Sequence, residues 1–351
     1  MKILTDLMPG DVRVEMHEGW HDHATVVYSR QNVLWFFLHR LLPQVFGASS
    51  GFMLNDIAAA VGTYLVRRQY DLIVMSPKMG LYFALLQSLF SKQARPKTVF
   101  FHFWVPDKAP GFLNSIREFL RRRALKYTEL IIVPSSSEIR IYAKRFLLPK
   151  RKFLHIPYHV NPRAWQGDRV EGDYVLSAGS SARDYWTFLE AAKAFPSQKF
   201  VLISDKRSIE NLCIPLNVEL HISISYQRYL QKLRHSRIVV IPLQNIRRSA
   251  GQRVILEAMA MGKAIIASKT PGVLDYIKHG ETGLLVSPES VSGLIKALES
   301  LFSNGHLVRE LGERARRIAE QRFVFDDIMS QLISTLYKIY ESDGPDFQLE
   351  F

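Results

Sequence analysis

One stretch, residues 249–286, constrains the fold more than any other part of the chain. It reads SAGQRVILEAMAMGKAIIASKTPGVLDYIKHGETGLLV. Its first part has apolar residues at helical spacing, Gly262 follows as a typical helix terminator, and residues 264–268 form the apolar run of a buried strand. A Thr-Pro-Gly turn and a Gly-Glu-Thr-Gly turn then precede a Leu-Leu-Val strand. This order of elements predicts helices packed against a parallel sheet.

The start of this helix is suited to holding an anion. Ser249 and Gln252 have the spacing of an S-x-x-Q capping box, which predicts a helix that begins at Ala250 or Gly251. Small residues at that point leave the free backbone N–H groups accessible to a ligand. We therefore expect a phosphate-binding helix terminus.

The same alternation of strands and helices extends along the chain. Apolar runs predict a first series of strands at residues 2–4, 25–28, 71–75, 98–103, 130–134 and 152–156. A second series follows at residues 174–178, 199–204, 218–222, 238–242, 264–268 and 284–286. A polar stretch at residues 162–172 reads as a linker. We predict an α/β protein with one Rossmann-like domain over residues 1–165, another over residues 174–325, and a final helix over residues 326–341.

Composition limits the kind of protein. A chain of 351 residues with 47% hydrophobic residues can form two domains with separate cores. The single cysteine, Cys213, excludes an intrachain disulfide and is expected to be a buried structural thiol. The start of the chain lacks the apolar core of a signal peptide, and the longest apolar stretch, residues 33–42, is too short to span a bilayer. These features predict a cytoplasmic protein.

The formal net charge is +13, and much of it lies in residues 108–152. Residues 113–127 have the spacing of a helix with an apolar stripe and flanking arginines. Such a helix can lie on an anionic membrane surface, here the inner face of the plasma membrane, or can pack on the sheet with a solvated basic face. No stacking-aromatic or zinc-spacing motif accompanies the charge, so we expect no nucleic-acid partner. The stripe consists of Leu113, Ile116, Leu120, Ala124 and Tyr127.

The E-A-M-A-x-G string that begins at Glu257, the Pro-Gly turn and the G-x-T-G-x-L-V string together resemble a known family. They are similar to the donor-binding half of GT-B glycosyltransferases of the retaining family-4 type, also called glycosyl transferases group 1. The resemblance extends over about residues 174–340. It implies two Rossmann-like domains that face each other across a cleft and a C-terminal helix that returns to the N-terminal domain. The C-terminal domain would bind a nucleotide-diphosphate sugar, and the N-terminal domain the acceptor.

The resemblance assigns roles to the helix that follows Ser249. Glu257 matches the second acid of the family signature, which hydrogen-bonds the ribose hydroxyls; the alternative is an ordinary surface glutamate. Ser249 stands where the family has its first acid, which contacts the transferred sugar. The backbone N–H groups of Ala250, Gly251 and Gln252 are expected to face the diphosphate.

Basic residues are the second part of the expected donor site. After the first strand of this domain the family has an arginine and then a lysine, and here Ser180 replaces the arginine while Arg183 lies near the lysine position. We expect Arg183 to bind the diphosphate, although an ion pair with Asp184 is the alternative. Arg253 is a further cation near the helix start.

In the N-terminal domain His102 is the candidate catalytic residue. It lies in the run Phe-Phe-His-Phe-Trp at the end of a predicted strand, and the resemblance implies that it orients the donor sugar or the reacting groups. A core histidine is the alternative. Weaker candidates are residues 135–137 and His159. No cluster has metal-ligand spacing, so we expect no metal and no cofactor besides the donor substrate.

These observations predict a metal-independent, retaining glycosyltransferase of the hexosyltransferase type. It would move a sugar from a nucleotide-diphosphate sugar to a glycan or lipid-linked acceptor, in the synthesis of a bacterial cell-surface polysaccharide. The serines at positions 249 and 180 keep a second hypothesis open, a non-catalytic GT-B protein that binds a nucleotide or glycan. A third is another GT-B enzyme, such as a sugar-nucleotide epimerase.

Overall fold

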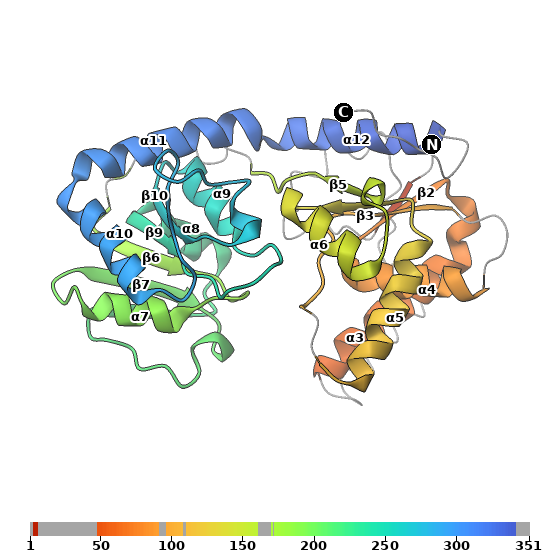
Figure 1. Cartoon of the computed structure of the whole chain (residues 1–351), viewed down its shortest axis with the longest axis horizontal. Helices are drawn as coiled ribbons and strands as arrows, with labels where there is room; N and C mark the ends of the chain where they lie inside the picture. The colour runs from red at the N-terminus through yellow and green to blue at the C-terminus, as the bar shows by residue number, and fades with distance from the viewer. Residues whose placement is uncertain are drawn as a thin grey trace. The chain divides into compact units, whose positions relative to one another are not determined.

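A computed structural model describes residues 3–5, 48–90, 96–107, 110–160, 170 and 172–341. The chain divides into two compact units, one of Met1–Ile156 with Met329–Phe351 and the other of Pro157–Ile328 (Figure 1). Each unit contains its own parallel sheet with helices. The predicted α/β fold with two Rossmann-like domains is confirmed.

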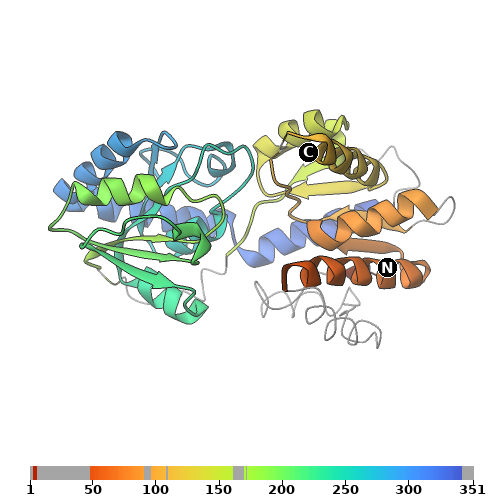
Figure 2. The same ribbon diagram turned by 90° about the horizontal axis from the view of Figure 1, so that it is seen from below.

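The sheet of the first unit has five described strands, all parallel, in the order β1-β2-β3-β4-β5. These strands are β1 (Ile3–Thr5), β2 (Leu72–Met75), β3 (Lys97–Phe100), β4 (Leu130–Val133) and β5 (Phe153–His155). The helices are α3 (Ala48–Val66), α4 (Pro77–Phe90), α5 (Phe112–Lys126) and α6 (Ser136–Phe146), and α3 lies beside α4 (Figure 2). The strand expected at residues 25–28 lies outside the described residues.

The strands of this sheet are apolar because helices cover them. All four residues of β2 are buried, and Phe100 at the end of β3 is fully buried as well. Phe103 makes edge-on contacts with Phe100, Tyr142 and Phe146, which joins the end of β3 to α6. Burial on both faces explains why these strands read as continuous apolar runs rather than as alternating ones.

The sheet of the second unit has six described strands, all parallel, in the order β11-β10-β9-β6-β7-β8. The strands are β6 (Tyr174–Ala178), β7 (Lys199–Ser204), β8 (Val218–Ile222), β9 (Ser236–Ile241), β10 (Ala264–Ser268) and β11 (Leu284–Val286). The helices are α7 (Tyr185–Lys193), α8 (Tyr226–Arg234), α9 (Gln252–Ala260), α10 (Val291–Ser303) and α11 (Gly305–Arg322). All but one of the predicted strands have the bounds expected from the sequence; β9 begins and ends earlier.

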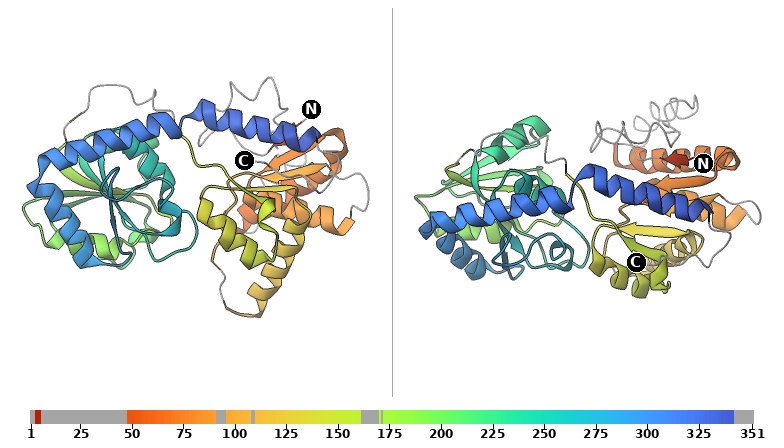
Figure 3. Two further views of the ribbon diagram at one scale, coloured as in Figure 1. Left: turned by 45° about the horizontal axis from the view of Figure 1, so that its top comes forward. Right: turned by 90° about the horizontal axis from the view of Figure 1, so that it is seen from above.

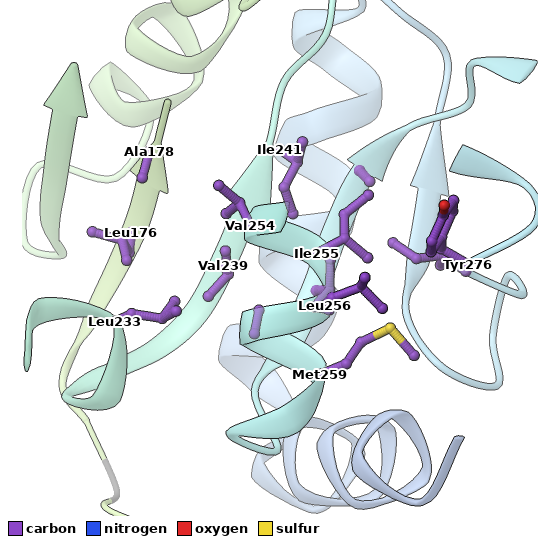
Figure 4. Close-up of a cluster of buried hydrophobic side chains, with 14 of the residues drawn as sticks. Leu176, Ala178, Leu233, Val239, Ile241, Val254, Ile255, Leu256, Met259 and Tyr276 are labelled. Atoms are coloured by element: carbon purple, nitrogen blue, oxygen red, sulfur yellow. The ribbon is translucent and has the colours of Figure 1, made fainter. Parts of the chain in front are cut away.

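Helix α9 is the most deeply buried helix segment near the predicted site. Val254, Ile255, Leu256 and Met259 are each at most 8% exposed and share a core with residues of strands β6, β9 and β10 (Figure 4). Neighbouring residues of β6 belong to different cores, because Leu176 lies in this one and Val175 in the core on the opposite face. The sheet is therefore covered on both faces, and α9 is held rigidly on one of them.

The predicted end of α9 at Gly262 is confirmed. Gly262 has a φ of 64°, its N–H donates to the Met259 carbonyl at 2.9 Å, and the Lys263 N–H donates to the Ala258 carbonyl at 2.9 Å. This pair of bonds is a Schellman motif, which needs a residue in the left-handed region. Helix α11 packs against α9 and β10 (Figure 3).

The last helix, α12 (Phe325–Glu341), connects the two units in sequence. Its residues from Met329 onward belong to the first unit, where Leu332 and Leu336 are fully buried. The Lys97 ammonium at the start of β3 donates to the Ile339 carbonyl at 2.6 Å. A cation at the carbonyl end of a helix is favourable. The predicted return of the terminal helix to the N-terminal domain is confirmed.

The expectation for Cys213 is wrong. Its side chain is exposed, in the loop between a short 3-10 helix, η5 (Arg207–Ile209), and strand β8. Leu212 and Ile214 on either side of it pack against the sheet. The thiol therefore faces outward because its two apolar neighbours take the inward positions.

We predict that Gly312→Ala destabilises the second unit. A Cβ at Gly312 in α11 would lie 2.0 Å from the Gly262 carbonyl oxygen, and that oxygen belongs to backbone that cannot yield easily. We expect the free energy of unfolding to fall by about 1–3 kcal/mol, measured by urea unfolding with circular dichroism.

The matched control is Gly305→Ala in the same helix, where nothing lies within 4 Å of the added Cβ. This substitution is expected to leave stability unchanged or to raise it by up to about 1 kcal/mol. Equal effects of the two substitutions would show that the close approach of α11 to Gly262 does not limit packing.

Candidate functional site

The predicted donor site lies where the order of strands reverses in the second sheet. Strands β6 and β9 are neighbours, but the chain continues from β6 to β7 on one side and from β9 to β10 on the other. Ligands of open α/β sheets bind outside the carboxyl ends of the strands at such a switch point. The loops after β6 and β9 are tied together there, because the Asp184 N–H donates to the Pro242 carbonyl at 3.0 Å.

Arg183 is the buried cation of this site. Its side chain is 8% exposed, and its Nε and Nη1 atoms donate to the carbonyls of Ala178 and Ser181 at 2.9 and 3.1 Å. No carboxylate of the described residues forms an ion pair with it; Asp184 instead caps α7 by accepting from the Thr187 N–H at 3.1 Å. Burial lowers the pKa of the Arg183 guanidinium from its ordinary value. The site therefore contains a desolvated positive charge held by neutral dipoles.

Two glycines make room for this guanidinium. A Cβ at Gly179, which has a φ of 109°, would lie 2.5 Å from Nη2 of Arg183. A Cβ at Gly251, which has a φ of 87°, would lie 3.4 Å from Nη1 of Arg183 and 2.9 Å from a methyl group of Ile241. The guanidinium thus lies between the loop after β6 and the start of α9. Larger residues at either glycine would displace it.

The helix start differs from the predicted capping box. Helix α9 begins at Gln252, and Gly251 occupies the N-cap position without a side-chain hydrogen bond to the helix. Gln252 Nε2 donates to the Gly272 carbonyl at 2.8 Å, so the glutamine side chain fastens the Pro-Gly turn rather than the cap. Ser249 is 8% exposed and its Oγ lies close to the same turn. The first N–H groups of α9 consequently have no side-chain acceptor from the N-cap.

Glu257 lies one turn further along α9 and is 3% exposed. Its Oε1 accepts from the Tyr226 hydroxyl at 2.6 Å and its Oε2 from the Tyr229 hydroxyl at 2.6 Å. Burial raises the pKa of Glu257, while the two hydroxyls and Arg253 act to lower it. The reading of Glu257 as an ordinary surface glutamate is therefore wrong.

The two tyrosines were not identified from the sequence. They stand three residues apart at the start of α8, in the string Tyr-Gln-Arg-Tyr, and this spacing places both on one helix face. The shared helix face of the two tyrosines could be predicted from the sequence. Their contact with Glu257 could not, because Glu257 is far away in sequence and the contact depends on how α8 and α9 pack.

The remaining cations near the helix start differ in their contacts. Both terminal nitrogens of Arg248 lie 3.2 Å from the Ser181 hydroxyl, which brings this residue to the loop that holds Arg183. Arg253 is exposed, and its guanidinium lies 6.0 Å from the centre of the Tyr226 ring. Arg248, which sequence reasoning did not rank, is thus placed beside Arg183, and Arg253 is placed beside Tyr226.

His102 belongs to the first unit. Strand β3 ends at Phe100, so His102 follows the strand instead of ending it as predicted. It has a φ of 48°, unusual for a residue other than glycine, and its ring stacks on that of Phe101 at 3.9 Å. Its position just beyond the carboxyl end of the central strand is typical of functional residues in parallel sheets.

The other histidine candidate, His159, has a different environment. Its ring lies 5.1 Å from that of Phe325, and both ring nitrogens are buried without a hydrogen-bond partner among the described residues. Burial lowers the pKa of His159 to about 4. Ser135 Oγ and Ser137 Oγ lie 2.9 Å from each other at the start of α6. In the part of the chain that the structure describes, no three His, Cys, Asp or Glu side chains form a group that could hold a metal ion.

Two parallel sheets of this topology define a protein of the GT-B fold. The chain is similar to the crystal structure of Anabaena Alr3699/HepE in complex with UDP and glucose, with a TM-score of 0.72 over 96% of this chain and 99% of that one. The sequences are 17% identical, so this likeness concerns the fold alone.

Residues 185–318 match the family model described as glycosyl transferases group 1. This match agrees with the resemblance over the second unit. The chain is 33% identical over 90 residues to the N-acetyl-alpha-D-glucosaminyl L-malate synthase of Bacillus anthracis, and 28% identical over 93 residues to the capsular polysaccharide biosynthesis glycosyltransferase CapM of Staphylococcus aureus. Each match covers 26% of this chain and 24% of the relative, so the chain matches about a quarter of each relative's length.

We predict that His159 makes the stability of the protein depend on pH. The pKa of about 4 lies below the ordinary value of 6.5, so the unfolded chain binds more protons between these pH values. The stabilisation is complete above pH 6.5 and is lost as the pH falls toward 4. We expect wild type to lose up to about 2 kcal/mol relative to His159→Phe between pH 7 and pH 5, measured by urea unfolding.

A difference between wild type and His159→Phe that stays constant over this pH range would contradict a buried, neutral imidazole.

Proposed function

We propose that the chain transfers a sugar from a nucleotide-diphosphate sugar to an acceptor hydroxyl. One observation carries the proposal: the buried Arg183 guanidinium lies beside the uncapped start of α9 and has no ion pair among the described residues. A buried cation that is held by neutral groups alone is suited to an anionic ligand, because a diphosphate offers the charge that the protein does not supply.

Different residues of the site would bind the diphosphate and the ribose of the nucleotide. The guanidinium of Arg183 offers donors to two phosphate oxygens, and the first N–H groups of α9 offer further donors along the helix dipole. Arg248, which contacts the same loop through Ser181, adds positive charge. Glu257 would accept from the ribose hydroxyls, because both oxygens of a carboxylate are hydrogen-bond acceptors.

The proposed reaction breaks the bond between the anomeric carbon and the diphosphate oxygen. The acceptor hydroxyl oxygen forms the new bond on the face of the sugar that the diphosphate leaves, and its proton goes to a diphosphate oxygen. In this proposal the positive groups around Arg183 stabilise the charge of the leaving diphosphate. His102 would orient the sugar or the reacting groups, a role that its position after β3 supports.

The acceptor we propose is a glycan or a lipid-linked glycan in a bacterial cell-surface polysaccharide. Support comes from the similarity to CapM, which is named for capsular polysaccharide biosynthesis. The serines at positions 180 and 249 leave a non-catalytic nucleotide-binding protein as the competing hypothesis. Binding of a nucleotide without donor hydrolysis or transfer on a broad acceptor panel would favour that competitor.

We predict that Arg183→Met weakens nucleotide binding without lowering the stability of the protein. Loss of a charged donor to phosphate is expected to weaken UDP or GDP binding on the order of 100-fold, measured by isothermal titration calorimetry. The free energy of unfolding is expected to stay unchanged or to rise, because a buried charge without a carboxylate partner is replaced by an apolar side chain of similar size.

Arg237→Met is the matched control, because Arg237 is partly buried and, like Arg183, donates to a backbone carbonyl, that of Leu301 at 3.4 Å. Its binding constants are expected to equal those of wild type. If Arg183→Met binds both nucleotides as tightly as wild type does, the site assignment is wrong.

We also propose that α5 docks on an anionic membrane surface. The structure exposes most of the predicted apolar stripe, because Leu113 is 68% and Ile116 41% exposed, while only the end at Ala124 is buried. Phe112 and Phe119 of the same helix are 79% and 63% exposed. A helix that packs only on its sheet leaves few large apolar side chains in solvent, so these residues favour the membrane interpretation. No helix among the described residues is long and apolar enough to cross a bilayer.

Some basic residues of α5 are bound to neighbouring protein groups, and others are exposed to solvent. Arg121 forms an ion pair with Glu118 at 2.6 Å, and Arg123 donates to the Ser88 carbonyl of α4 at 3.2 Å. Arg122 and Lys126 are exposed. Together with the exposed Arg117, they are the cations of α5 that can meet anionic lipid headgroups.

We predict that replacing Arg117, Arg122 and Lys126 by serine abolishes flotation with anionic liposomes. Each cation is worth roughly 1 kcal/mol near such a surface, so the partition coefficient should fall on the order of 100-fold. Phe112→Ser with Phe119→Ser is expected to reduce it as well.

Two controls change residues of the second unit. Replacing the exposed Lys206, Lys296 and Arg317 by serine controls for the loss of charge, and Leu216→Ser controls for the loss of an exposed apolar side chain. These variants should float as wild type does. An α5 variant that floats equally well would remove the membrane proposal and leave the donor site unaffected.

A further inference from the structure

The carboxylate that we assign to the ribose is already enclosed by two tyrosines. The hydroxyls of Tyr226 and Tyr229 each lie 2.6 Å from one oxygen of Glu257, and the residue as a whole is 3% exposed. A sugar hydroxyl that is to reach this carboxylate must therefore take the place of a group that now covers it.

The two tyrosines differ in how easily they can move. Tyr229 is 9% exposed and belongs to the apolar core between α8, α9 and the sheet. Tyr226 is 50% exposed and is the first residue of α8, directly after the N-cap Ser225. Displacing the Tyr229 ring would open a cavity in the core, whereas rotating the Tyr226 ring moves a half-exposed side chain at a helix end.

The surroundings of Tyr226 support a movable position. Its ring lies 5.9 Å from that of Tyr229 at an angle of 30° and 6.0 Å from the guanidinium of Arg253, which is itself exposed. The buried tyrosine thus anchors Glu257, and the exposed one covers it.

We propose that Tyr226 is a gate on the ribose subsite: its hydroxyl occupies Oε1 of Glu257, and a ribose hydroxyl of the nucleotide replaces it on binding. This inference rests on the proposed function, since it needs Glu257 to receive the ribose. The tyrosine hydroxyl and the sugar hydroxyl are both donors to the same acceptor, so they compete for it. The gate makes nucleotide affinity depend on the strength of one protein hydrogen bond.

The test compares Tyr226→Phe, Tyr229→Phe and wild type at pH 8 by calorimetric titration with UDP or GDP, whichever binds more tightly. Without the competing hydroxyl, Tyr226→Phe should bind the nucleoside diphosphate about 5- to 10-fold more tightly. Tyr229→Phe is the matched control, because it removes the other hydroxyl from an anchor that does not move; it should show no gain.

The decisive ligand is the 2′,3′-dideoxynucleoside diphosphate of the same base. It has no hydroxyl to replace that of Tyr226, so the gain of Tyr226→Phe over wild type should disappear. A structural effect of the substitution would change the affinities of both ligands by the same factor. Tyr226→Leu, which removes both the hydroxyl and the ring, should show the same selective gain if the ring only covers the site.

Unchanged or weaker binding of the ribonucleotide by Tyr226→Phe would overturn the gate, and so would an equal gain for the dideoxy ligand. The proposed function fails in a different way: wild type would then bind neither UDP nor GDP, or Arg183→Met would bind them as wild type does. A protein that binds nucleotide through Arg183 but shows no selective gain in Tyr226→Phe retains the proposed function and loses only the gate.

Discussion

The candidate site depends on one interaction, the burial of the Arg183 guanidinium against backbone carbonyls at the sheet's switch point. The carbonyls of Ala178 and Ser181 accept its hydrogen bonds, and the glycines at 179 and 251 allow it to lie against two loops at once. Buried charges without a partner are costly, so a fold tolerates one only where it has a use. The free energy cost of burying this guanidinium is offset by the rest of the second unit, whose sheet is covered by apolar cores on both faces.

The start of α9 and the rest of that helix therefore have opposite requirements, ligand access at one end and tight packing along the remainder. Helix α9 presents open N–H groups at Gly251 and Gln252, yet the residues that follow are among the most completely buried in the chain. The Schellman motif at Gly262 and the close approach of α11 hold the other end of the helix. A helix fixed by its apolar face and its C-terminus can keep its N-terminus available to a ligand without fraying.

The sequence predicted the second sheet well, because most of its strands are apolar runs bounded by turn residues and need no long-range information. It failed where a side chain has a partner far along the chain. Gln252 has the spacing of a capping residue, but its amide finds the Gly272 carbonyl. Glu257 was found through its motif, whereas its partners Tyr226 and Tyr229 were not, since only the packing of α8 on α9 brings them together. The end of β3 was placed too late because the aromatic run continues past Phe100 into the loop.

Packing of the Pro-Gly turn also explains why a small residue stands at position 249. Its Oγ lies 3.1 Å from where a Cβ at Gly272 would be, and its Cα lies 2.7 Å from that point, so the Pro-Gly turn presses directly on this residue. The turn is held there by the bond from Gln252 and leaves little room for a longer side chain. An acid at this position would have to point away from the turn and would also reduce the positive charge beside Arg183. In the proposed donor site the serine would therefore preserve the attraction for a diphosphate, and the change would fall on contacts to the transferred sugar, where the resemblance implies a carboxylate.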